Sequence, residues 1–345
     1  MKNILLILVG GTICTVLNEK GTLSIKKEAG AVIKENFLKS DSPYAGKVNI
    51  DLTENLCVLS ENMTTDKWNT IIDTYRSYTG KKHYDGVIFA HGTDTLAYTA
   101  SLFSMILAET KIPVFFVSSN KRLDADGANG NDNMRCAVEC ICKGIEPNVY
   151  VSYKNISDGQ MYLHLASRIE QCKNYSDDFS SSGAIKVNGV SDEFIETVKK
   201  QFPSVKRKSF INVFDEWKIK ECVLKIVPYV GINYNAFNVE GYSAILHGTY
   251  HSGTACAEGE NSVQSLADKC RNSDVYLAPS KLTGEIYETV DVMGNHTANG
   301  KKINFLYGMT NEMAYCKLLL AYSLFESEKE RKEFIGTECN FEIIA

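Results

Sequence analysis

The first 150 residues alternate between short apolar runs and longer stretches in which apolar residues recur every three or four positions. The runs predict buried strands, and the recurring pattern predicts helices. The strands are expected at 3–9, 86–90, 113–118 and 148–151, and the helices at 65–78, 95–109 and 131–143. Strands that are apolar almost throughout are typical of a sheet covered on both faces. The pattern therefore predicts an α/β fold with a mostly parallel, helix-covered sheet.

The pattern loosens after residue 177, and a second alternation of strands and helices begins near residue 221. Strands are expected at 222–227, 243–246 and 275–278, and a closing helix at 311–324. We therefore expect a larger N-terminal domain over 1–190, a charged linker over 191–220 and a smaller C-terminal α/β domain over 221–345. The basic run Lys206-Arg207-Lys208 in the linker is interpreted as a solvated face.

Composition narrows the class of partner. The 345 residues carry a net charge of −5, which indicates no nucleic-acid binding, and no apolar run reaches the roughly 18 residues of a membrane span. The eleven cysteines are odd in number and form no CxxC pair, which favours reduced thiols in the cytoplasm. The cluster Cys136, Cys140 and Cys142 fits core packing better than zinc binding. A small molecule is the expected partner.

Two polar turns follow predicted strands. Gly10-Gly11-Thr12 ends the first strand, and His91-Gly92-Thr93-Asp94-Thr95 ends the strand at 86–90. Parallel sheets bind ligands at the edge where such turns gather, and both the P-loop and the GxGxxG patterns are missing. One threonine can act as a nucleophile while the other, with its aspartate, positions the attacked group. For the second turn alone, a helix N-cap by Thr95 or Asp94 is an equal alternative.

These two strings resemble the two signature segments of the bacterial-type L-asparaginases. Three other stretches are similar to segments of that family: Ser60-Glu61-Asn62-Met63, Ser119-Asn120-Lys121-Arg122-Leu123 and Met309-Thr310-Asn311-Glu312-Met313-Ala314. The resemblance is strong over 1–140 and weaker over 150–305. It implies a cytoplasmic amidohydrolase that needs no cofactor and no metal. The enzyme would convert asparagine or glutamine to the acid and ammonia through a threonine acyl-enzyme.

The resemblance also implies roles for individual residues. Thr12 matches the primary nucleophile, Thr93 lies beside the reacting amide, and Asp94 binds the α-ammonium group of the substrate. Ser60 contacts the α-carboxylate, and Glu61 and Gly92 belong to the same substrate-binding set. A homodimer or homotetramer is the implied assembly.

The sequence departs from the family at three places. No tyrosine occurs before Tyr44, where the family has one shortly after the nucleophile. The family lysine of the loop after the fourth strand is replaced by Arg168, His164 or Lys173, of which Arg168 fits the local pattern best. An arginine would keep the charge but could not shuttle a proton.

The third departure is the polar turn His247–Thr254. This turn could supply a base, or Tyr250 could substitute for the missing tyrosine. A metal site on His247 and His251 is less consistent with the glycines of the turn.

Three alternatives to an asparaginase therefore stay open. They are a related amidase for another small amide, the ammonia-releasing subunit of a tRNA-dependent amidotransferase, and an amino-acid-binding paralogue with impaired catalysis.

Overall fold

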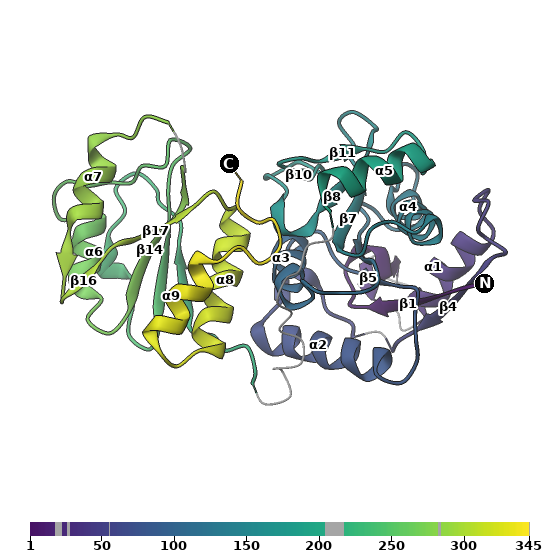
Figure 1. Cartoon of the computed structure of the whole chain (residues 1–345), viewed down its shortest axis with the longest axis horizontal. Helices are drawn as coiled ribbons and strands as arrows, with labels where there is room; N and C mark the ends of the chain where they lie inside the picture. The colour runs from purple at the N-terminus through teal and green to yellow at the C-terminus, as the bar shows by residue number, and fades with distance from the viewer. Residues whose placement is uncertain (18–22, 26–27, 55, 204–216, 282–283, 345) are drawn as a thin grey trace. The chain divides into compact units, whose positions relative to one another are not determined.

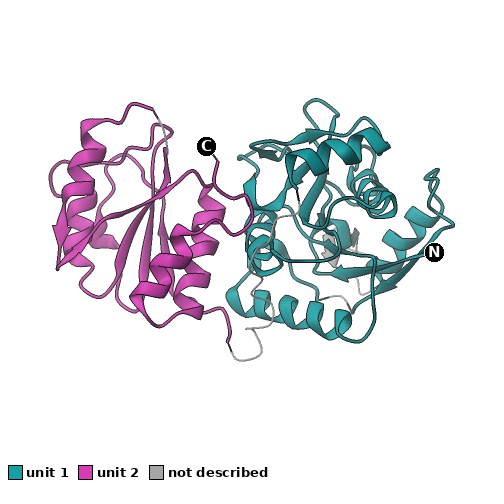
Figure 2. Cartoon of the chain, in the orientation of Figure 1, with its two compact units in different colours: residues 1–216 teal, residues 217–345 magenta. Residues whose placement is uncertain are grey.

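The computed structural model of the chain describes residues 1–17, 23–25, 28–54, 56–203, 217–281 and 284–344. It divides into two compact units, residues 1–216 and residues 217–345 (Figure 2). Each unit is an α/β structure built on its own sheet (Figure 1). The α/β fold class with a larger N-terminal unit and a smaller second one is as the sequence predicts.

The sheet of the first unit has the strand order β11-β8-β7-β6-β5-β1-β4. The five strands β4, β1, β5, β6 and β7 are parallel, and β8 and β11 run antiparallel to their neighbours. The sheet strands are β1 (Lys2–Leu8), β4 (Val48–Leu52), β5 (Gly86–Ala90), β6 (Val114–Val117), β7 (Val149–Lys154), β8 (Met161–Leu165) and β11 (Ile185–Lys186). Two small antiparallel pairs are β2 (Thr15–Leu17) with β3 (Leu23–Ile25) and β9 (Ile169–Glu170) with β10 (Ser180–Ser181).

Helices cover both faces of this sheet. They are α1 (Ala29–Leu38), α2 (Thr65–Thr79), α3 (Leu96–Ile106), α4 (Gly130–Lys143) and α5 (Asp192–Gln201). A Cβ on Gly86 would meet Ile141 of α4, whereas Phe89 packs against Tyr75 of α2 and Phe103 of α3. Since residues an odd number apart on a strand point to opposite faces, α4 covers one face, and α2 and α3 cover the other.

The segment expected to be a linker is helical in its first part. Ser191 accepts a hydrogen bond from the Phe194 backbone N–H (3.1 Å) and so caps α5, whose Phe194 and Val198 are buried in the first unit. An N-cap and two buried apolar residues four apart stabilise a helix packed on a core, which a charge count alone does not show. The run Lys206-Arg207-Lys208 lies outside the described residues.

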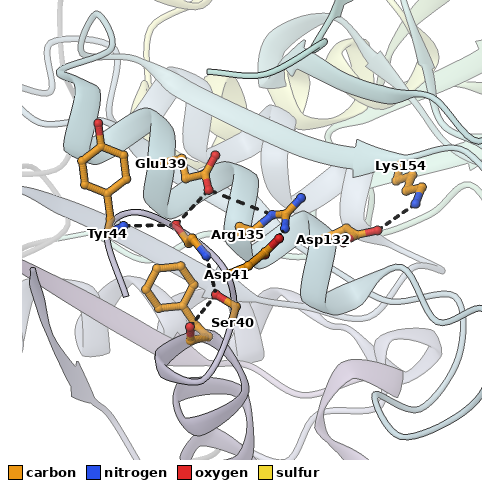
Figure 3. Close-up of polar contacts among 9 residues, drawn as sticks. Ser40, Asp41, Tyr44, Asp132, Arg135, Glu139 and Lys154 are labelled. Carbon is orange, nitrogen blue, oxygen red and sulfur yellow. Dashed lines mark hydrogen bonds and ion pairs between the residues drawn. The ribbon is translucent and has the colours of Figure 1, made fainter. Parts of the chain in front are cut away.

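A row of charged side chains joins α4 to neighbouring segments (Figure 3). Arg135 pairs with Asp41 (2.6 Å) and with Glu139 (4.0 Å), and Lys154 pairs with Asp132 (2.8 Å). Such partly exposed pairs contribute about 0–1 kcal/mol each. They position the segment after α1 against α4 rather than supply much stability.

The second unit is built on the parallel sheet β12-β13-β14-β17. Its strands are β12 (Val223–Ile226), β13 (Ala244–Gly248), β14 (Asp274–Ser280) and β17 (Asn304–Tyr307), with a small pair β15 (Thr297–Ala298) and β16 (Lys301–Lys302). Its helices are α6 (Val263–Lys269), α7 (Glu288–Asn295), α8 (Asn311–Leu324) and α9 (Glu328–Gly336). Ile245 of the sheet packs in one cluster with α6 and α7, and α8 packs against β12, β13 and β14.

A fully buried ion pair fastens the last residues to α8. Lys317 Nζ lies 2.6 Å from Glu342 Oε1 and donates a second bond of 2.6 Å to the Thr337 carbonyl. Glu342 also accepts backbone N–H bonds from Cys339 and Asn340. Burial by itself would raise the pKa of Glu342, but the Lys317 ammonium and these bonds leave the pKa below its ordinary value. The carboxylate is therefore charged at neutral pH.

Two expectations drawn from composition concern disulfides and membrane spans. Among the described residues, which include all eleven cysteines, no disulfide joins any pair. No helix in the described part of the chain combines the length and the apolar character that crossing a membrane requires.

Candidate active site

The turn after β1 is shaped by two glycines. The Gly10 N–H donates to the Ala90 carbonyl (3.2 Å), and the Gly11 N–H donates to the Val58 carbonyl (3.0 Å). Both glycines have positive φ, +136° and +78°, which L-residues rarely adopt. A Cβ on Gly10 would lie 2.2 Å from the Val58 carbonyl oxygen, so the position has no room for a side chain. Thr12 follows at once, half-buried, at the start of the short 3-10 helix η1 (Thr12–Cys14).

The turns after β1 and β5 touch through their glycines. Because β1 and β5 are parallel neighbours with Leu8 paired to Ala90, both strands deliver their turns to the same point of the sheet edge. A Cβ on Gly11 would lie 2.1 Å from the Gly92 Cα. Thr12 and Thr93 are thus each one residue from a direct backbone contact.

Ser60 is the third member of this cluster. A Cβ on Gly92 would lie 2.4 Å from the Ser60 hydroxyl oxygen. That hydroxyl donates to Asp94 Oδ2 (3.3 Å) and accepts from the Asp94 backbone N–H (3.3 Å). Ser60 is buried in the short 3-10 helix η2 (Ser60–Asn62), whereas the Asp94 side chain is exposed. Its carboxylate is therefore accessible to a ligand.

The N-cap alternative for the second turn is wrong. Thr95 occupies the N-cap position of α3 but makes no side-chain capping bond. Its hydroxyl donates to the Ser60 carbonyl instead (2.9 Å). The Thr95 hydroxyl and the Asp94 carboxylate thus bond to η2 rather than to their own helix.

Gln171 contacts the same turn and was missed by the sequence analysis. It follows β9, and its Nε2 donates to the Thr93 carbonyl (2.7 Å) while its Oε1 accepts from the Ala97 N–H (3.3 Å). The only sequence signal was its place in the loop expected to carry a cation, three residues after Arg168. Spacing along one chain cannot reveal a contact between residues 78 apart.

Two buried histidines near these segments are neutral. His91 Nδ1 donates to the Gly92 carbonyl (2.7 Å), and burial lowers the pKa of His91 to about 4. His164 on β8 has Nδ1 2.8 Å from the Ser181 hydroxyl, and burial likewise lowers its pKa to about 4. Burial therefore favours the neutral form of His164, and its role as the loop cation stays a prediction.

The remaining expected residues lie as follows. Arg168 ends the 3-10 helix η3 (Ala166–Arg168), and its Nη1 would be 3.7 Å from a Cβ on Gly183. Lys173 and Glu61 are exposed. The roles of these three side chains at the site stay predictions.

The polar turn of the second unit separates its two histidines. His247 is buried on β13 with its Nε2 2.8 Å from the Tyr234 hydroxyl, and burial lowers its pKa to about 4. His251 and Tyr250 lie in the exposed turn beyond the strand. Within the described residues, no three side chains of His, Cys, Asp and Glu gather as ligands for a metal. Tyr250 as a substitute for the family tyrosine stays a prediction.

The larger sheet thus carries two glycine-containing, threonine-bearing turns at one edge, which is the arrangement that the asparaginase-like motifs predict. The family model described as "Asparaginase, N-terminal" matches residues 3–203. The chain belongs to this family, which confirms the resemblance read from its motifs.

The fold agrees with solved members. An L-asparaginase from Thermococcus kodakarensis superposes with a TM-score of 0.77 at 20% identity, covering 99% of both chains. L-asparaginase I from Vibrio cholerae superposes with a TM-score of 0.72 at 22% identity, covering 100% of this chain and 99% of that chain. These identities support the fold alone.

The curated relatives carry a different name, that of one subunit of a glutamyl-tRNA(Gln) amidotransferase. The relative from Haloquadratum walsbyi is 28% identical over 242 residues, which are 68% of this chain and 52% of that protein. Across the first three such relatives the match covers 39% to 55% of their length, so the chain spans about half of them.

Proposed function

We propose that the site hydrolyses the side-chain amide of asparagine, or of glutamine, to the acid and ammonia. The observation that carries the proposal is the contact between Gly11 and Gly92, which supports a shared position for Thr12 and Thr93. A nucleophile and a second hydroxyl at one sheet edge suit acyl transfer.

In the proposed reaction the Thr12 Oγ attacks the amide carbon. The new C–O bond gives a threonine ester, the C–N bond breaks, and the hydroxyl proton leaves with the nitrogen as ammonia. Water held near Thr93 then cleaves the ester and restores the Thr12 hydroxyl. Backbone N–H groups of the glycine turns are suited to stabilise the negative oxygen of the intermediate.

The exposed carboxylate of Asp94 is suited to bind the α-ammonium group of the substrate. Its hydrogen bond to the Ser60 hydroxyl is long, at 3.3 Å. A charged substrate group can replace such a bond, because hydrogen bonds that involve an ion pair are stronger. Ser60 would then turn to the α-carboxylate.

A second candidate is favoured by the curated relatives: the chain releases ammonia from an amide for a tRNA-dependent amidotransferase. In that case turnover of a free amino-acid amide is slow alone and rises with partner subunits and charged tRNA. The net charge of −5 favours a small-molecule substrate over direct binding of tRNA by this chain.

The test is ammonia release from asparagine and from glutamine by the wild type, Thr12→Ala and Thr93→Val. Removing the nucleophile should abolish detectable turnover, and Thr93→Val should lower it by about 100-fold or more. Thr70→Ala and Thr70→Val are matched controls, since the Thr70 hydroxyl donates within α2, to the Asp66 carbonyl (3.0 Å).

The outcomes separate the candidates. Full activity in Thr12→Ala would refute the nucleophile assignment. A wild type that releases no ammonia from either amide, alone or with partner subunits and charged tRNA, yet gains thermal stability with aspartate, would identify a binding paralogue. Ammonia release only in the presence of partner subunits and charged tRNA would identify the amidotransferase subunit. Light scattering of the purified chain tests the homodimer or homotetramer that the resemblance implies.

A further inference from the structure

The Gln171 side chain is a part of the candidate site to which the proposed reaction assigns no role. Its amide spans the turn after β5: the donor end bonds to the Thr93 carbonyl at 2.7 Å, and the acceptor end bonds to the Ala97 N–H at 3.3 Å. Thr93 lies in the turn, and Ala97 lies in the first turn of α3. One side chain from a distant loop therefore fixes both ends of the segment that carries Asp94.

This segment needs an outside partner because α3 begins without a local cap. The first N–H groups of a helix have no acceptor within the helix. The Thr95 side chain caps none of them, since its hydroxyl donates to the Ser60 carbonyl. The Leu96 N–H has only a long bond to the Thr93 carbonyl (3.4 Å). Gln171 supplies an acceptor to one of these first N–H groups. Ser60 holds the same segment through Asp94, so two separate loops determine its position.

An amide holds position without exchanging a proton at neutral pH. The neighbouring Cys172 is also protonated, because burial, with added repulsion from Asp177 and Asp178, raises the pKa of its thiol to about 12. Neither side chain is suited to proton transfer, and the two bonds of Gln171 fit a role in geometry.

We propose that Gln171 is a positioning residue whose donor end sets the orientation of Thr93 and Asp94 and whose acceptor end fixes the start of α3. The expected effect of Gln171 on kcat rests on the proposed amide hydrolysis. Its expected effect on the start of α3 does not.

Three substitutions test the donor end and the acceptor end of the Gln171 amide separately. Gln171→Met removes both bonds, Gln171→Glu keeps the acceptor for Ala97 but loses the donor, and Gln171→Lys keeps the donor for Thr93 but loses the acceptor. Gln201→Met is the matched control, because Gln201 Nε2 donates to the Gly183 carbonyl (2.6 Å) at the end of α5. The measurements are kcat and KM for amide hydrolysis, and hydrogen exchange at the Ala97 amide.

Loss of the donor should lower kcat about tenfold in Gln171→Met and Gln171→Glu with little change in KM, and Gln171→Lys should keep most of the wild-type kcat. Exchange at Ala97 should speed up about tenfold in Gln171→Met and Gln171→Lys but not in Gln171→Glu. Should Gln171→Met not fold, the two charged variants still separate the ends.

Equal kcat loss in Gln171→Lys and Gln171→Glu would overturn the donor role. Ala97 exchange as slow in Gln171→Met or Gln171→Lys as in Gln201→Met would overturn the acceptor role. A wild type without ammonia release would refute the proposed function, and the Ala97 exchange would still decide the inference.

Discussion

Replacing Gly11 by alanine tests whether the close approach of two turns builds the candidate active site. A Cβ on Gly11 would lie 2.1 Å from the Gly92 Cα and 2.4 Å from the Gly92 nitrogen. Carbon atoms in contact lie about 3.5–4.0 Å apart, so one turn must move by about 1.4 Å, the difference between 3.5 and 2.1 Å. The atoms on the Gly92 side are backbone and cannot rotate away.

The expected loss has two parts. An alanine at the Gly11 backbone conformation, φ of +78° and ψ of −174°, costs about 1–3 kcal/mol of stability. Displacing a reacting group by about 1 Å costs about 100-fold in rate. Gly11→Ala should therefore release ammonia from asparagine at least about 100-fold more slowly than the wild type, and its thermal midpoint should fall by more than the backbone strain alone explains.

Gly144→Ala is the matched control. Gly144 ends α4 with the same φ of +78° but with ψ of 44°, in the left-handed helical region, whereas Gly11 has ψ of −174°. No heavy atom of the described residues would lie within 4 Å of a Cβ on Gly144. This variant should show only the cost of a left-handed alanine, about 2–4 °C in thermal midpoint per kcal/mol, with wild-type turnover. If Gly11→Ala matched Gly144→Ala in both turnover and midpoint, the reasoning about the contact between the turns would be refuted.

Two further predictions concern stability. Lys317→Met should lower the free energy of unfolding in urea by about 3–5 kcal/mol, because it leaves the buried Glu342 carboxylate without its cation. Adding Glu342→Gln should recover part of this stability. An equal loss of stability in the double variant would contradict the reasoning. The folded-state pKa values of His91, His164 and His247 are lowered from 6.5 to about 4. Their stabilising contribution is therefore present above pH 6.5 and lost as pH falls toward 4, by up to about 1.4 kcal/mol per pH unit for each histidine. Unfolding free energies that stay constant from about pH 7 to about pH 4.5 would exclude this effect.

Local pattern was enough for the elements that the sequence analysis expected. The helix expected at 311–324 and the strand expected at 86–90 have those bounds in the structure, and the apolar run at 3–9 is β1 (Lys2–Leu8). Buried strands and amphipathic helices carry their signal within a few neighbouring residues, which one sequence contains in full. The helix over 192–201 was not expected, because the burial of Phe194 and Val198 depends on contacts with the rest of the unit.

The sequence by itself determined which chemical groups follow which strands: a threonine after two glycines, and a Thr-Asp pair after β5. Only the tertiary structure decided which of these groups meet. The placement of β1 beside β5 brings Gly11 against Gly92, and the fold joins Ser60 to Asp94 across 34 residues and Gln171 to Thr93 across 78. The physical reason is that strand order and burial are properties of the packed chain. The same packing buries His164 and places Gln171 against the turn after β5.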